Sequence, residues 1–179
     1  MTMGDPAGVG AEIIVKAYAM ADLHSKASPF VIGSASCLRL AMTQTGIDLP
    51  LLVIHEPAEA KPGVLSVLDP HSLNAGDFIQ GEVSADCGHA AVGYFEAAIR
   101  LCQADQADGI VTCPINKEAV HVAGYVGDIG HQEILARMTG ASSTATMLIT
   151  PGLKVAHLST HKPLAEAVAF VKAPVIIEK

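Results

Sequence analysis

The sequence predicts an α/β protein in which helices pack on a largely parallel sheet. Short apolar runs typical of strands alternate along the chain with segments whose apolar residues recur at helical spacing. Half of the 179 residues are apolar and 16% are charged, so the chain can bury a substantial core. These observations favour one domain or one large subdomain with a layered α/β architecture.

The elements of the first half follow one another as turn, helix and strand. They are expected as a glycine-rich turn at 4–10, a helix at 11–20 and strands at 30–33, 51–54 and 64–68. Ser34 follows a strand and can cap the next helix, because its hydroxyl can accept a bond from a backbone N–H. Residues 61–81 are rich in Pro, Gly, Asp and Asn, and we interpret them as a subdomain seam or as an active-site loop.

The second half continues the alternation. It is expected to hold a long helix within 81–103, a strand at 109–113, a short helix from Asn116 or Lys117, a helix at 131–138, strands at 145–149 and 153–158, and a last helix from Pro163 through Phe170. Pro114 cannot continue the strand before it, and Gly140 stops a helix. Pro151 and Gly152 separate two apolar runs, which predicts a hairpin.

Composition and charge exclude several classes of function. The formal net charge is −7 and basic clusters are absent, so a nucleic acid is not an expected partner. The apolar runs are too short and too interrupted for a membrane span. The first residues lack the basic and apolar regions of a secretory signal, so we expect a cytoplasmic location and a small-molecule partner.

The four cysteines are spread without a C-x-x-C pair or zinc-site spacing, so reduced thiols are expected. Cys113 closes an apolar run and precedes a proline. Its thiol could be a nucleophile, but we favour a small buried filler. The sequence also lacks a G-x-S-x-G elbow and a P-loop, which argues against serine hydrolases and nucleotide triphosphatases.

The first motif that could carry chemistry is G-D-P-A-G-V-G-A-E at 4–12. Its three glycines would let backbone N–H groups approach a pyrophosphate or carboxylate at a helix N-terminus. Their spacing does not match the G-x-G-x-x-G fingerprint of dinucleotide-binding turns. A ligand loop and a tight structural turn are therefore equally open.

The second motif is T-C-P-I-N-K at 112–117, where a strand meets a helix. In α/β sheets, ligands bind in the crevice beyond the carboxyl ends of the strands. Lys117 could hold a substrate carboxylate or phosphate there, or relay a proton if burial lowered its pKa. The alternative is a solvated lysine at the start of a helix.

The third motif is G-H-Q-E at 130–133. His131 and Gln132 place an ionisable group and an amide at a helix start, which suits a polar substrate. Glu133 is better explained as a capping residue that reaches back to a free N–H.

The fourth motif is H-L-S-T-H-K-P-L, which contains His157 and His161. A helix would place both histidines on one face, but the local pattern indicates a strand followed by a turn, so a zinc pair on a helix is not expected. We expect His157 in the apolar interior. His161, at the exit of the strand, is placed to reach a cleft.

Taken together and in this order, these motifs resemble the 4-hydroxythreonine-4-phosphate dehydrogenase family of vitamin B6 synthesis and its catabolic relatives. The landmarks are T-M-G-D-P-A-G-V-G, G-E-V-S-A at 81–85, T-C-P-I-N-K, G-H-Q-E and S-T-H-K-P-L. The resemblance runs from Met1 to about Phe170 and covers only the N-terminal half of such an enzyme. It implies a fold like that of isocitrate and isopropylmalate dehydrogenases, with two α/β subdomains around a cleft, and a homodimer.

The resemblance also implies a set of site residues. Such enzymes oxidise a secondary alcohol of a small hydroxy acid with NAD or NADP, and a divalent metal (Zn, Mg or Co) bound by three histidines holds the substrate. The T-H-x-P-L element makes His161 one metal ligand, and the other two belong to a C-terminal part absent here. The family's G-H-T-E element makes His131 and Gln132 substrate-binding residues. Lys117, from its place at the strand exit, is expected to be a substrate or proton-relay group.

The implied reaction is oxidation of 4-phosphohydroxy-L-threonine or a related substrate, coupled to decarboxylation. The metal would lower the pKa of the alcohol and stabilise the enolate formed as CO2 leaves. Gln132 stands where the family has threonine, and its longer amide offers both a donor and an acceptor. A cis-dihydrodiol carboxylate dehydrogenase, as in terephthalate breakdown, is therefore an alternative. The chain could also be a truncated noncatalytic binding or assembly module, or a phosphotransacylase-like acyl transferase.

Overall fold

The computed structural model describes residues 1–127, 130–159 and 162–178. The chain forms two compact units, which divide between Ile134 and Leu135. Residues 61–81, which the sequence suggested as a seam or an active-site loop, lie wholly within the first unit.

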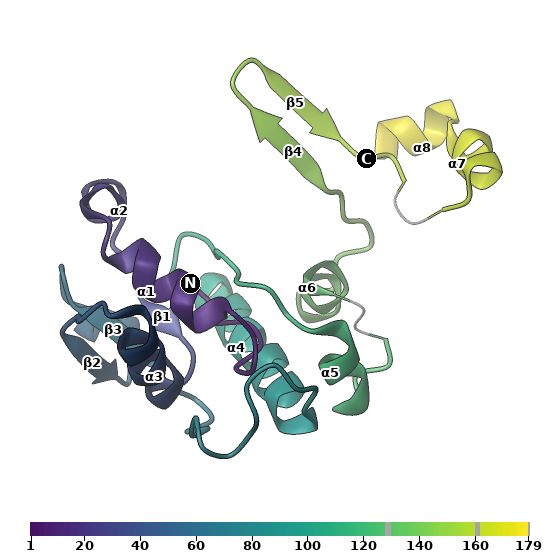
Figure 1. Ribbon diagram of the computed structural model, residues 1–179. Helices are drawn as coiled ribbons and strands as arrows, with labels where there is room; N and C mark the ends of the chain where they lie inside the picture. Colours follow the sequence, from purple (N-terminus) through teal and green to yellow (C-terminus); the bar gives the residue numbers. More distant parts are fainter. Residues whose placement is uncertain (128–129, 160–161, 179) are drawn as a thin grey trace. The chain divides into compact units, whose positions relative to one another are not determined.

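The first unit contains a small sheet and the helices that pack on it (Figure 1). Its elements are α1 (Gly10–Tyr18), α2 (Ala21–Lys26), β1 (Val31–Ile32), α3 (Ala35–Thr45), β2 (Leu51–Ile54), the 3-10 helix η1 (Pro57–Glu59), β3 (Leu65–Leu68), α4 (Ala85–Gln103), α5 (Lys117–Val122) and the first turn of α6 (His131–Thr139). Helices α1 and α3 pack against each other, and α4 packs against β1 and along α5. The expected order of elements is confirmed, although α2 and η1 carried no clear signal in the sequence.

The sheet of the first unit is parallel, as predicted. Its strand order is β1-β3-β2, and both pairings are parallel. Thr2 adds parallel bridges to Ile32 on one side and to Thr112 on the other. The predicted strand at 109–113 is reduced to that bridge, and Val111 is 65% exposed instead of buried. The strand is short because Thr2 alone pairs with it.

Capping side chains set the helix boundaries. The Ser34 hydroxyl accepts a hydrogen bond from the Cys37 N–H at 3.1 Å, as the sequence predicted for α3. Ser84 does the same for α4, accepting from the Cys87 N–H at 3.5 Å, so this helix begins at residue 85 although the pattern allowed a start at 81. Gly46 ends α3 with φ +68°, a conformation that glycine adopts without strain.

The second unit holds the rest of α6, the hairpin strands β4 (Met147–Thr150) and β5 (Leu153–Ala156), α7 (Leu164–Phe170) and α8 (Ala173–Glu178). The strands pair antiparallel with Thr150 opposite Leu153, which confirms the predicted hairpin. Gly152 supplies the turn, with φ +79°. Every residue of both strands is exposed, although the two runs are largely apolar.

Among the helices of the described segments, none has the length and apolar character needed to span a membrane. The longest, α4, has 19 residues, and its polar face carries Asp86, Glu96 and Arg100.

Candidate functional site

The carboxyl ends of the strands bring several loops of the first unit to one edge of the sheet. Because the strands are parallel, the segments that follow them leave the sheet at the same side. These segments are the turn at 4–10 after Thr2, Ser34 after β1, residues 69–81 after β3 and residues 113–117 after Thr112. This edge is where a ligand site is expected in such a sheet.

The glycines of the 4–10 turn serve close packing of backbone on backbone. A Cβ on Gly4 would overlap the carbonyl oxygen of Pro114, and Gly4 has φ +71°. A Cβ on Gly10 would overlap the carbonyl oxygen of Met3. The Asp5 N–H also donates to the Pro114 carbonyl at 3.0 Å. These contacts favour the structural turn over the ligand loop.

Acidic side chains lie beside the same turn. Asp5 is only 5% exposed, and its carboxylate accepts a hydrogen bond from the Ala7 N–H at 2.9 Å. Burial raises the pKa of Asp5, and the bond from Ala7 opposes that rise. Glu12, in the first turn of α1, has a buried carboxylate oxygen without a hydrogen-bond partner. Two carboxyl groups at this helix start do not fit a pyrophosphate, so we assign no cofactor phosphate to it.

The 69–81 loop folds onto the glycine turn. The Gly81 N–H donates to the Ala7 carbonyl at 2.9 Å, and the Gln80 side-chain amide donates to the Gly8 carbonyl at 3.1 Å. At its other end, the Asp69 carboxylate accepts a bond from the Ala35 N–H at 3.0 Å. Both ends of the loop are therefore anchored at the carboxyl edge of the sheet.

The 113–117 segment supplies one buried thiol and one exposed lysine. Cys113 is 5% exposed, its thiol donates to the Gly10 carbonyl at 3.6 Å, and burial raises its pKa. It is the small buried filler that we favoured. Asn116 caps α5, with its side-chain oxygen accepting from the Glu118 N–H at 2.9 Å. Lys117 begins α5 and is exposed, so its amine is available to a ligand.

His131 begins α6 and lies against α4. Its ring centroid is 4.7 Å from that of Phe95, with the two planes inclined by 81°. Nε2 of His131 is buried and has no hydrogen-bond partner, and burial lowers the pKa of the imidazole. Gln132 is half-buried in the same turn. A Cβ on Gly130 would lie 3.5 Å from a carboxylate oxygen of Glu133, so this side chain lies near the start of the helix, and its capping role stays a prediction.

Helix α4 connects the two predicted substrate-binding elements, because α5 packs along it and His131 contacts its Phe95. The structure gives no direct contact between Lys117 and His131. His161, the predicted metal ligand, lies outside the described residues, and its role stays a prediction. Within the segments that the structure describes, no three His, Cys, Asp or Glu side chains form a group that could hold a metal ion.

His157 differs from its prediction. It lies just after β5 and is half-buried, and its backbone N–H donates to the Thr146 carbonyl at 2.9 Å. Because the hairpin strands are exposed on both faces, they offer no apolar interior for this side chain.

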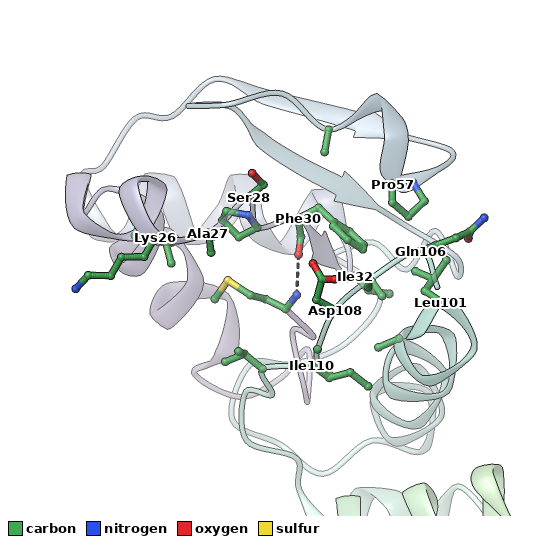
Figure 2. A pocket seen from close by; sticks show the side chains of 18 of the residues that line it. Lys26, Ala27, Ser28, Phe30, Ile32, Pro57, Leu101, Gln106, Asp108 and Ile110 are labelled. Atoms are coloured by element: carbon green, nitrogen blue, oxygen red, sulfur yellow. Dashed lines mark hydrogen bonds between the residues drawn. The ribbon is translucent and has the colours of Figure 1, made fainter. Parts of the chain in front are cut away.

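A hollow of about 1020 Å³ in the first unit lies at the opposite edge, beside the amino ends of the strands (Figure 2). Phe30, Ile110 and Leu101 line it, and the Met1 amine donates to the Phe30 carbonyl at 2.7 Å inside it. Helix α2 forms part of its rim. This hollow lies away from the carboxyl edge, so we do not assign the site to it.

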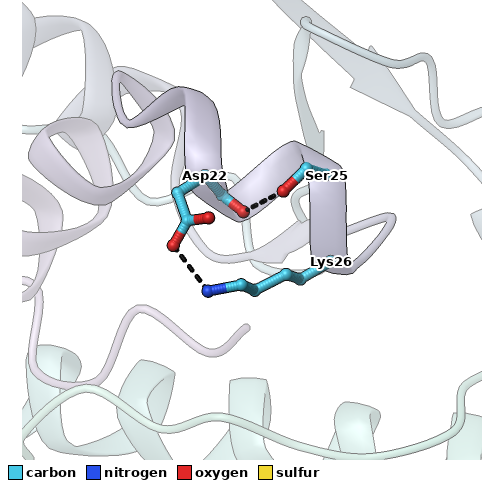
Figure 3. Close-up of polar contacts among 3 residues, drawn as sticks. All are labelled: Asp22, Ser25 and Lys26. Carbon is cyan, nitrogen blue, oxygen red and sulfur yellow. Dashed lines mark hydrogen bonds and ion pairs between the residues drawn. The ribbon is translucent and has the colours of Figure 1, made fainter.

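Lys26, on the rim of this hollow, is already paired with an acidic side chain. The Lys26 amine lies 2.6 Å from the Asp22 carboxylate, and the Ser25 hydroxyl donates to the Asp22 carbonyl at 2.9 Å (Figure 3). Both charged side chains are largely exposed, so the ion pair contributes little to stability. The pair gives no indication of an anion site.

Sequence reasoning missed three residues, two at the carboxyl edge and one beside His131. Asp5 is part of the G-D-P motif, but its burial, which places a carboxyl group where a phosphate would have to bind, is visible only in the structure. Asp69 follows β3 directly, and a strand-end acid in a D-P-H run was a usable signal. Phe95 could not be found, since its contact with His131 joins residues that are far apart in the sequence.

Comparison with known proteins identifies relatives along nearly the whole chain. The family model described as pyridoxal phosphate biosynthetic protein PdxA matches residues 25–179. D-threonate 4-phosphate dehydrogenase of Cupriavidus necator is 37% identical over 174 residues, which is 96% of this chain and 52% of the relative. The enzyme of that name from Pectobacterium atrosepticum is 38% identical over 90% of this chain and 50% of its own.

Solved structures agree with this result. A 4-hydroxythreonine-4-phosphate dehydrogenase from Burkholderia phymatum superposes with a TM-score of 0.90 at 35% identity, covering 99% of this chain and 54% of its own. The enzyme from Klebsiella pneumoniae gives 0.89 at 37% identity. The chain spans about half the length of the curated relatives it matches. On the strength of the family model and these relatives, the chain belongs to the PdxA family of pyridoxal phosphate biosynthetic proteins.

Proposed function

We propose that this chain is the substrate-binding part of a dehydrogenase that oxidises a secondary alcohol of a small hydroxy acid phosphate. The observation that carries the proposal is that relatives named as D-threonate 4-phosphate and 4-hydroxythreonine-4-phosphate dehydrogenases align with 96% and 99% of the chain at 37% and 35% identity. The types of residue at the predicted site also support the proposal, because an exposed lysine and a histidine can bind a phosphorylated acid.

His131 and Lys117 have distinct roles in this proposal. His131 starts α6 with a desolvated imidazole, whose neutral form can donate at one nitrogen and accept at the other. It contacts a polar group of the substrate. Lys117 is exposed at the start of α5 and holds the phosphate or carboxylate by charge, or relays a proton. Gln132 adds an amide contact from the first turn of α6.

The acceptor of the hydride is NAD or NADP, and we assign no residue of this chain to it. A divalent metal would supply polarisation of the alcohol oxygen and stabilisation of the enolate left by decarboxylation. His161 is its predicted ligand here. The described residues bring no three metal donors together, so the remaining ligands must come from outside them. We further propose that the enzyme works as a homodimer.

Gln132 bears on the choice of substrate. It is half-buried and stands where the resemblance predicts threonine, so the group that it contacts must match a longer amide. A cis-dihydrodiol carboxylate is the competing substrate with the same alcohol chemistry.

A noncatalytic binding module is the second candidate. It is the alternative that the sequence leaves open. In that case the carboxyl edge would bind the substrate without turning it over.

Turnover and binding assays separate these candidates. The chain is incubated with NAD or NADP, a divalent metal and candidate hydroxy acids, with and without the C-terminal half of a relative, and the absorbance of reduced cofactor is followed. Turnover with a phosphorylated hydroxy acid supports the dehydrogenase. Binding of 4-phosphohydroxy-L-threonine without turnover, even with the added half, supports the module.

Variants connect the assay to the site. The His131→Ala and Lys117→Ala substitutions should each weaken substrate binding at least tenfold, whereas Lys26→Ala, at the other edge of the sheet, should leave it unchanged. Equal binding by all three variants would remove both Lys117 and His131 from the substrate site.

A further inference from the structure

The contact between His131 and Phe95 has the geometry of a specific aromatic pair. A centroid distance of 4.7 Å and an interplanar angle of 81° describe an edge-to-face arrangement, which aromatic rings prefer to a stacked sandwich. Phe95 is 4% exposed and lies on the buried face of α4. The imidazole therefore packs against a ring that is itself held in place.

The chain on both sides of His131 is also held against the first unit. Ile134, one turn further along α6, is 0% exposed, and its N–H donates to the Gly130 carbonyl at 3.2 Å. Earlier in the chain, the ring centroid of Tyr125 lies 5.3 Å from the ring centroid of His89 on α4. Tyr125, shortly after α5, and His131, at the start of α6, thus each form an aromatic pair with a residue of α4.

One nitrogen of this imidazole has no partner. Nε2 of His131 is buried without a hydrogen bond, although buried polar atoms are ordinarily paired. If the imidazole only filled space, its unpaired nitrogen would lower the stability of the fold, because the atom loses its hydrogen bonds to water and gains none in return. An aliphatic side chain would pack there without that cost, so the polar ring indicates a role other than packing.

We propose that Phe95 is a positioning residue for His131: the phenyl ring of Phe95 fixes the plane of the imidazole, so that the imidazole meets the substrate in one orientation. This inference rests on the proposed substrate-binding role of His131. A leucine at position 95 would keep the surroundings apolar but would impose no preferred ring plane.

NMR of the 179-residue chain with labelled histidine and phenylalanine tests the proposal. In the unaltered chain, nuclear Overhauser contacts should join the ring protons of Phe95 and His131, and the aromatic ring current should displace the His131 resonances. Phe95→Leu should abolish that displacement and weaken substrate affinity, whereas Phe95→Tyr should retain both. Ile99→Val, one turn along the same buried face and 1% exposed, is the matched control and should change neither.

Each outcome decides a separate claim. Absence of the ring contacts in the unaltered chain overturns the positioning role, even if Phe95→Leu does not fold. If 4-phosphohydroxy-L-threonine moves the His131 resonances equally in the unaltered chain and in folded Phe95→Leu, Phe95 does not position the ring, and the proposed function stands. If this ligand leaves His131 unmoved while the ring contacts are present, the substrate-binding role fails, and with it the purpose assigned to Phe95.

Discussion

The two units of the chain use apolar sequence in opposite ways. In the first unit, strand and helix residues such as Val67 and Ile14 are 0% exposed. In the second unit, the hairpin is just as apolar, yet Leu148 is 57% and Ile149 is 68% exposed. A run of apolar residues therefore predicts a strand more reliably than it predicts burial.

The difference follows from how each unit is built. The sheet of the first unit joins segments that are distant in sequence, so its strands form only together with the helices that cover them. The hairpin of the second unit closes through a local turn at Gly152 and needs no distant partner to pair its strands. We expect the first unit to carry the cooperative stability of the chain and the second to open at low cost.

The largest effect should come from removing a buried side chain of the first unit. Ile14→Ala should lower the free energy of unfolding by about 2–5 kcal/mol, because Ile14 is 0% exposed and its loss leaves a cavity. Ile149→Ala should stay within about 0.5 kcal/mol, since this side chain is 68% exposed. Urea unfolding followed by circular dichroism measures both. Equal losses would mean that the hairpin is buried in solution.

The next effect concerns two glycines. Gly10→Ala should cost about 3 kcal/mol, because the new Cβ would overlap the Met3 carbonyl oxygen and the backbone must move. Gly140→Ala meets no atom within 4 Å and has only the strain of φ +67°, so about 1 kcal/mol is expected. Thermal unfolding compares the two. A milder loss at Gly10 would show that the turn yields, and would reopen the ligand-loop interpretation.

These contrasts show which parts of the fold can be predicted from the sequence. Ser34 was recognisable as a cap, and Asn116 as a helix start, because their hydrogen bonds reach only two or three residues along the chain. The hairpin was recognisable from its turn for the same reason. The shortness of the strand at Thr112 was not, since it depends on the pairing with Thr2.

The candidate site likewise has features that the local sequence predicts and features that only the folded structure reveals. Lys117 could be placed at a strand exit and a helix start from the local pattern, and the structure agrees. The partner of His131 could not be found, because Phe95 is adjacent only once α4 and α6 have folded. The environment of Asp5 was equally hidden, since its burial depends on contacts with residues 80–81 and 113–114 around the turn. Patterns locate side chains on elements, but long-range packing decides their surroundings.

In the 179-residue chain with a free amine at Met1, acid should weaken the first unit through that amine. Burial lowers the pKa of this group from 8.0 to about 6. Between these values the unfolded chain binds more protons, so the free energy of unfolding should rise from pH 6 to pH 8, by on the order of 2 kcal/mol at about 1.4 kcal/mol per unit. Urea unfolding at pH 6, 7 and 8 measures the slope.

N-terminal acetylation is the control for this prediction, because it removes the titrating group. The acetylated chain should show a flatter dependence over the same range, and the remaining slope belongs to groups such as His131, whose pKa is also lowered by burial. A slope that survives acetylation undiminished would assign the whole effect to the histidines.

The smallest effect should come from Tyr94, where the packing of the first unit leaves a polar atom unsatisfied. Tyr94 is 0% exposed and its hydroxyl has no hydrogen-bond partner, so Tyr94→Phe should stabilise the chain by up to about 1 kcal/mol. Tyr18→Phe is the matched control, since the Tyr18 hydroxyl donates to the Pro29 carbonyl at 2.5 Å and its removal should cost about 1 kcal/mol. Chemical unfolding of the two variants should therefore give changes of opposite sign. A loss in Tyr94→Phe would mean that this hydroxyl has a partner in solution, such as an ordered water, and that the first unit is better satisfied than its contacts indicate.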